Sequence, residues 1–177
     1  DELDQAWEQA GHLTQAQTAD EVVRAMRAIA ARDRLPDAYR WLAKTADWRQ
    51  VVDFLALEGG PDGGFDDLVA VCQVGLSGSA KLELGKNYWD EMGQGEAAGV
   101  HTTLYADLVE AIDMPSIPRE LLPVEALERA ALGGLLATNR WLQPEMIGAL
   151  GLLELQAGPR CRLVLQAFDR LRAPRPA

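Results

Sequence analysis

Hydrophobic positions along the chain recur mainly at spacings of three and four residues, the period of a helix with one face against a core. Thr18 and Glu21 have the spacing of a capping box, which marks a helix start. The apolar stripe that follows comprises Val22, Val23, Met26, Ile29 and Ala30. The pattern predicts a helix that ends before Pro36, where a second helix begins.

The same spacing predicts further helices over residues 47–58, 65–79 and 124–141, and through the apolar run that follows Pro144. Glycine–proline segments separate these helices, and no segment alternates as a strand does. We therefore expect an all-α chain of about seven or eight helices. With 177 residues and 48% hydrophobic composition, it suits one domain over residues 1–177, with a polar lead-in over 1–17 and a proline-rich tail over 173–177.

Residues 87–108, NYWDEMGQGEAAGVHTTLYADL, contain the first candidate chemistry. Glu91 shares a predicted helix face with Tyr88, and His101 shares one with Tyr105, so both polar groups are expected to point inward. On one unbroken helix the two would lie about 80° apart, but the two glycines of the GQG segment could bend the chain and turn both onto one point. A buried carboxylate beside an imidazole is either hydrogen-bonded to it or shares a metal with it. Both interpretations stay open.

Two more glutamates lie on predicted apolar faces. Glu154 is the only acidic residue in the apolar run over residues 146–157, so we expect it to be protonated, paired or bound to a metal. Arg160 and Arg162 follow closely and offer an ion pair as the alternative. Glu58 continues the apolar face of the 47–58 helix at its end, where a solvated side chain is the alternative to a ligand.

Composition limits the partners and the compartment. A net charge of −10 argues against nucleic acid or an anionic membrane, because phosphate binding requires clustered Lys and Arg. No apolar run approaches the roughly 20 residues of a membrane span, and the N-terminus does not resemble a signal peptide. Cys72 and Cys161 lack CxxC spacing, which indicates reduced thiols and a cytoplasmic protein. A homodimer is favoured only by the general prevalence of that state.

The chain contains none of the sequence motifs GxGxxG, Walker loop, HExxH, GxSxG or clustered CxxC. Serine or cysteine nucleophile chemistry therefore has little support. Inward carboxylates and a histidine on several helices are the kind of set that holds two irons in a helical bundle. The four candidates of this kind are Glu58, Glu91, His101 and Glu154.

Over residues 48–171 the chain resembles the haem-oxygenase-like diiron oxidases, also called iron-containing redox enzymes. The segment NYWDEMGQGEAAGVHTTLY fits their pattern of N, DE, G-x-G and then H followed by L and an aromatic residue. The similarity continues through LLATNRWLQPEMIGALGLLELQAGPRCRLVL. The resemblance implies an all-α, haem-oxygenase-like bundle without haem. It also implies two Fe(II) ions and O2, used on a small amino-acid-like or fatty-acid-like substrate by N-oxygenation, desaturation or C–C cleavage in natural product biosynthesis.

The resemblance also assigns residue roles. It implies as metal ligands Glu91, His101, Glu154 and Glu58, with Asp67 as the fallback for the earliest carboxylate. The family's last ligand helix carries a His-x3-Asp-x2-His-like motif, which the sequence up to Ala177 does not contain. We therefore expect the remaining ligands to lie beyond Ala177.

Two other functions remain open. One is a non-catalytic helical bundle, a binding or carrier protein with an incomplete metal site, in which His101 and Glu154 pair internally. The other is a thiaminase-like relative of the same fold, which requires a reactive cysteine. Neither Cys72 nor Cys161 lies in the electropositive sequence setting that stabilises a thiolate.

Overall fold

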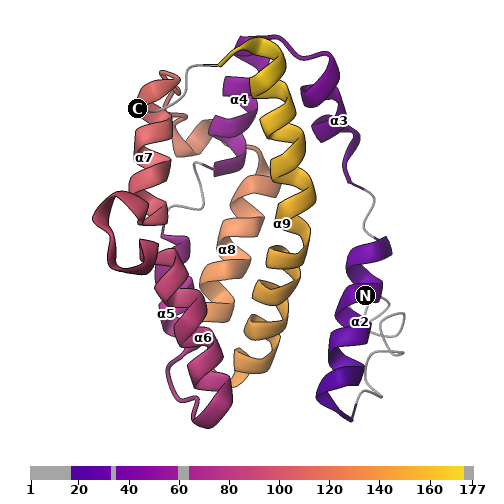
Figure 1. Ribbon diagram of the computed structural model, residues 1–177, viewed down its shortest axis with the longest axis vertical. Helices are drawn as coiled ribbons and strands as arrows, with labels where there is room; N and C mark the ends of the chain where they lie inside the picture. Colours follow the sequence, from indigo (N-terminus) through magenta and orange to yellow (C-terminus); the bar gives the residue numbers. More distant parts are fainter. Residues whose placement is uncertain (1–16, 33–34, 60–63, 174–177) are drawn as a thin grey trace.

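The computed structural model describes residues 17–32, 35–59 and 64–173, and these residues are predominantly helical (Figure 1). The α-helices are α2 (Ala19–Arg32), α3 (Asp37–Lys44), α4 (Trp48–Gly59), α5 (Phe65–Cys72), α6 (Gly78–Glu91), α7 (His101–Ala111), α8 (Val124–Thr138) and α9 (Gln143–Leu171). Short 3₁₀ turns connect several of them. Within the described ranges the only strand-like pairing is an isolated antiparallel bridge between Met92 and Val100. The all-α prediction is confirmed.

Two helices begin with reciprocal side-chain caps. The Glu21 amide donates to Thr18 Oγ1 at 3.3 Å, and the Thr18 amide donates to Glu21 Oε2 at 3.0 Å, so the predicted capping box is confirmed. At the start of α4, Asp47 and Gln50 exchange the same pair of hydrogen bonds, each of 2.9 Å. These bonds satisfy backbone amides that a helix start leaves without intrahelical partners.

Helix α9 is the element against which most of the others pack. It spans 29 residues, has a proline in its first turn and continues through Pro159. Figure 1 shows α8 beside the lower half of α9 and α3 beside its upper end, while α2 lies along its other side. The contact with α2 is close, since a Cβ at Gly151 would come within 2.8 Å of the Met26 methyl.

Two apolar cores lie along α9. One joins α3 and α4 to the C-terminal half of α9, and its buried members are Tyr39, Leu42, Ala46, Val51 and Ala167. The other joins α5 and α8 to the N-terminal half of α9, with Leu84 and Tyr88 of α6 packed on its edge. Its buried members are Val69, Cys72, Ala137, Met146 and Leu150. Because one helix belongs to both cores, α4, α5, α6 and α8 are all supported directly or indirectly by α9.

Helix α5 is shorter than the sequence predicts. A helix over residues 65–79 is expected, but α5 ends at Cys72. The amide of Gln143 donates to the carbonyls of Cys72 at 3.0 Å and Val74 at 2.8 Å, and Arg140 also donates to the Val74 carbonyl. Gly75 then turns the chain with a φ of +87°. The helix end is therefore satisfied by side chains almost 70 residues away, a contact that local periodicity does not reveal.

The predicted polar lead-in and proline-rich tail lie outside the described residues, except for Gln17 and Ala173. None of the helices in the described part of the chain combines the length and the apolar composition needed to cross a membrane.

Candidate metal centre

The nine residues between α6 and α7 fold back on themselves, so that the end of one helix meets the start of the next. Helix α6 ends at Glu91 and α7 begins at His101, and the residues just inside this pair, Met92 and Val100, form the antiparallel bridge. Gly93 has a φ of +58°, and a Cβ on it would lie 2.6 Å from the Val100 nitrogen. A glycine is therefore required there by both conformation and space. Figure 1 shows this loop projecting at the side of the bundle between α6 and α7.

The loop brings the two predicted residues into contact. Nδ1 of His101 lies 2.6 Å from Oε2 of Glu91, a short contact within hydrogen-bond distance. Glu91 is 5% exposed and is the one buried charged residue of the described chain. The prediction that Glu91 points inward, and that the glycines turn both side chains onto one point, is confirmed. The prediction that His101 also points inward is wrong, because its side chain is 54% exposed at the first turn of α7.

The surroundings of Glu91 favour its neutral form. Burial raises the pKa of Glu91 above its usual range, against the lowering effect of the neighbouring His101 imidazole. The negative charges of Glu154 and Asp66 raise the pKa of Glu91 further. Three carboxyl groups from α5, α6 and α9 therefore act electrostatically on one point, and a cation placed there would relieve the repulsion.

Glu154 and Asp66, the two carboxyl groups whose charges raise the pKa of Glu91, differ in what the sequence predicts for them. Glu154 was expected to be buried in an apolar helix, yet its side chain is exposed, and within the described residues no ion pair joins it to Arg160 or Arg162. The apolar run is itself only partly covered, which is why the burial argument failed. Asp66 lies in the first turn of α5, where an acid is favourable without any further role. Its influence on Glu91 could not be predicted from local sequence.

Glu58 belongs to a different group of side chains. The Tyr39 hydroxyl donates to Glu58 Oε1 at 2.8 Å, and Arg129 Nη1 lies 3.2 Å from the same oxygen. Arg129 also donates to the Glu58 carbonyl. The prediction that Glu58 continues the inward face of its helix is broadly right, but its carboxylate is held by a tyrosine and an arginine. Glu58 is not among the charges that shift the pKa of Glu91. Asp67, the fallback, is likewise not among those charges.

The donor chemistry of the pair fits iron, although the described residues hold no assembled set of three or more metal-binding side chains. Carboxylate and imidazole are the ligands of non-haem Fe(II). Neighbouring ligands on a divalent metal lie roughly 3 Å apart, close to the 2.6 Å between His101 and Glu91. A buried carboxylate whose burial and acidic neighbours disfavour its charge is the group that a cation would stabilise.

Comparison with known proteins identifies the family to which this chain belongs. The family model described as iron-containing redox enzyme matches residues 52–177, which include α5 to α9 and all the residues around Glu91. No curated protein and no solved structure gives a significant match. The matched segment contains helices α5 to α9 and carries the carboxylate–imidazole pair. The chain therefore belongs to the iron-containing redox enzyme family and has its all-α, haem-oxygenase-like fold.

Proposed function

We propose that this protein is a non-haem, iron-dependent oxidoreductase that holds two Fe(II) ions and uses O2 to oxidise a small, amino-acid-derived molecule. The reaction classes are N-oxygenation, desaturation and C–C cleavage, in the biosynthesis of a specialised metabolite in the cytoplasm. The observation that carries the proposal is the contact between Glu91 and His101 in the segment that matches the family model. This contact supports the proposal because it joins a carboxylate and an imidazole, the side-chain types that bind non-haem iron, at the junction of two helices.

The residues that would hold iron are Glu91 and His101, with Glu154 and Asp66 as the further carboxylates. Asp66 replaces Glu58 in the proposed ligand set, because the charge of Asp66 acts on Glu91 whereas Glu58 is engaged with Tyr39 and Arg129. The exposure of Glu154 and His101 leaves one side of this centre open.

Iron bound here would supply the electrons and the open coordination positions with which O2 is activated. The side chains of Glu91 and His101 determine how iron would bind. Glu91 acts as a ligand only as the carboxylate, and its raised pKa would make iron binding at this point weaker as pH falls. His101, fixed at the first turn of α7, is held by the short contact that orients its ring. The burial of Glu91 keeps water from one face of the centre.

A second function, a non-catalytic binding or carrier protein, is favoured by one observation. No group of three or more potential ligands is assembled within the described ranges. In that case the pair between Glu91 and His101 would serve stability, and its removal would destabilise the bundle without any effect on iron.

The two functions are separated by O2 consumption. The protein would be loaded anaerobically with Fe(II), desalted, and mixed with O2 and a panel of amino acids while O2 uptake and product masses are recorded. We expect uptake that one class of substrate stimulates, that His101→Ala abolishes, and that the surface variant Glu83→Gln retains. Iron-loaded protein that consumes no more O2 than its His101→Ala variant with every panel member would favour the carrier.

A further inference from the structure

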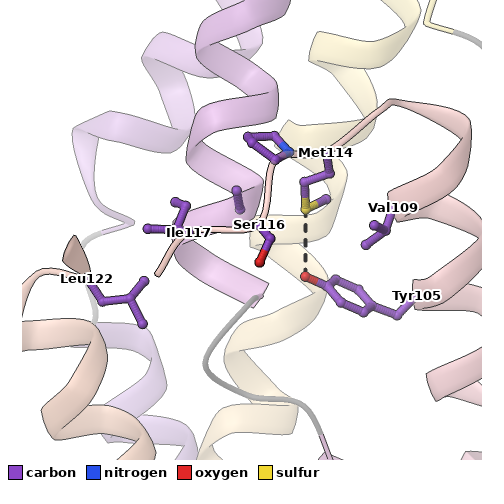
Figure 2. Close-up of a pocket in the computed structure, with 8 residues that line it drawn as sticks. Tyr105, Val109, Met114, Ser116, Ile117 and Leu122 are labelled. Carbon is purple, nitrogen blue, oxygen red and sulfur yellow. Dashed lines mark hydrogen bonds between the residues drawn. The ribbon is translucent and has the colours of Figure 1, made fainter. Parts of the chain in front are cut away.

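A cavity of about 220 Å³ lies between the end of α4, helix α7 and the segment that connects α7 to α8. Figure 2 shows its lining side chains converging on one space from these three parts of the chain. Its apolar wall comprises Ala56, Val109, Met114, Ile117 and Leu122, while Pro115 and Ser116 form an exposed rim. Among the described residues of the lining, the hydroxyls of Tyr105 and Ser116 are the polar side-chain groups, and none of these residues is charged.

Helix α7 contributes residues to both the cavity and the candidate metal centre. His101, Tyr105 and Val109 are spaced four residues apart, so they follow one another along one face of this helix. Each step advances about 6 Å along the axis. Tyr105 and Val109 line the cavity, and His101, one turn before Tyr105, contacts Glu91. The cavity-lining residue Tyr105 therefore lies about one helical turn from His101 on the same face of α7.

The space beside Tyr105 is maintained by close packing on its other side. A Cβ at Gly59 would lie 2.8 Å from the Tyr105 ring, so the ring rests directly on the backbone at the end of α4. The Tyr105 hydroxyl points to Met114 Sδ at 3.7 Å, as Figure 2 shows. A thioether is a weak acceptor. A ligand oxygen in place of the Met114 sulfur would therefore accept a stronger hydrogen bond from the Tyr105 hydroxyl.

We propose that this cavity binds the uncharged, apolar end of the substrate, with Tyr105 donating a hydrogen bond to an oxygen of the bound molecule. A cavity of roughly 150 Å³ accommodates a six-carbon ring, so this one accommodates roughly eight or nine non-hydrogen atoms. A cationic or anionic end is disfavoured, because the described lining residues offer no compensating charge. The identification of the bound molecule as a substrate rests on the proposed function, whereas the binding of an apolar molecule in the cavity does not.

This inference narrows the proposed substrate. Amino-acid derivatives with an ammonium or guanidinium side chain are poor candidates for this cavity. Those with an aliphatic side chain, or an aliphatic chain with one oxygen, fit it. The reacting atom would lie at the end of the molecule that leaves the cavity towards His101.

The cavity can be tested on the iron-free protein with 1-heptanol as the probe and heptylammonium as its charged counterpart. The four methionines of the chain would be labelled with ¹³C at the methyl group, and the Met114 signal would be assigned by Met114→Leu. We expect saturable movement of the Met114 signal by heptanol with a Kd on the order of 1 mM. Met146, in the core beside α5, should not move. Heptylammonium should bind at least about tenfold more weakly.

Two variants define the site. Ile117→Phe fills the cavity and should weaken heptanol binding at least about tenfold, while the matched change Leu121→Phe, at an exposed position of the same connection, should leave it unchanged. An unshifted Met146 signal shows that each variant is folded. The proposal is overturned if the Met114 signal does not saturate, if heptylammonium binds equally well, or if Ile117→Phe binds like the natural chain. Because no iron is present, these outcomes are independent of the O2-uptake test.

Discussion

The backbones of Gly93 and Gly99 touch at the base of the loop between α6 and α7. A Cβ on Gly99 would lie 3.1 Å from the Gly93 Cα, and a Cβ on Gly93 would overlap the Gly99 backbone. This close crossing allows the Met92–Val100 bridge to form, and the bridge sets Glu91 and His101 side by side. The geometry of the candidate centre therefore depends on two residues that carry no functional group.

The first prediction concerns that crossing. Gly93→Ala adds a methyl group at a φ of +58° and against the opposing strand of the loop, so we expect it to lower the free energy of unfolding by at least about 3 kcal/mol and to weaken iron binding. Gly78→Ala is the matched control, since Gly78 has a φ of +59° but no atom within 4 Å of its Cβ position. It should cost about 1 kcal/mol and leave iron binding intact. Equal losses in urea denaturation would refute the role of the crossing.

The second prediction distinguishes two adjacent aspartates in the first turn of α5. Asp66→Asn removes a charge that acts on Glu91, and we expect it to weaken Fe(II) affinity about tenfold or more. Asp67→Asn removes the same charge from the same helix turn, so any effect through the helix dipole is matched. It should leave the affinity nearly unchanged. Anaerobic Fe(II) titration measures both, and a larger effect of Asp67→Asn would return that residue to the ligand set.

The third prediction concerns Glu58. Since its carboxylate accepts from Tyr39 and pairs with Arg129, we expect Glu58→Gln to lower the free energy of unfolding by about 1 kcal/mol without loss of iron. Glu83→Gln breaks an exposed pair with Lys86 and should cost less than about 0.5 kcal/mol. Loss of iron in Glu58→Gln alone would show that the earlier ligand assignment was correct.

The fourth prediction follows from the raised pKa of Glu91 in the iron-free protein. Between the usual glutamate pKa and the raised one, the folded state binds more protons than the unfolded state, so stability falls as pH rises through that window. We expect Glu91→Gln to remove this fall and to stabilise the iron-free protein at neutral pH by on the order of 1 kcal/mol. The exposed Glu96→Gln should keep the natural pH profile. Denaturation at several pH values makes the comparison, and superimposable profiles for the natural chain and Glu91→Gln would contradict it.

The sequence predicts the fold and the pair, but not the neighbours of the pair. Helical periodicity located most of the helices, and the spacing of Glu91 and His101 around two glycines indicated a bend that could join them. Tertiary contacts decided the rest. Glu58 has the right phase, yet its partners Tyr39 and Arg129 are 19 and 71 residues away.

For Glu154, the sequence predicts burial, whereas the side chain is exposed in the structure. An apolar run predicted burial, but burial depends on what covers each face of the helix, and Leu153 and Leu155 beside it are 43% and 44% exposed. A residue's own sequence neighbours do not contain that information. The sequence does not single out Asp66, because an acid in a first helical turn already has a sufficient structural reason. Only its position relative to α6 in the folded chain shows its effect on Glu91.

The fifth prediction tests the central claim, that the pair of Glu91 and His101 binds iron. Iron per chain would be measured after anaerobic Fe(II) loading and desalting, for the natural chain, His101→Ala, and Thr103→Ala as the exposed control on the same turn of α7. We expect bound iron in the natural chain and in Thr103→Ala, approaching two per chain if the ligand set is complete, and a loss of most of it in His101→Ala. Iron retained in full by a folded His101→Ala variant would contradict the account.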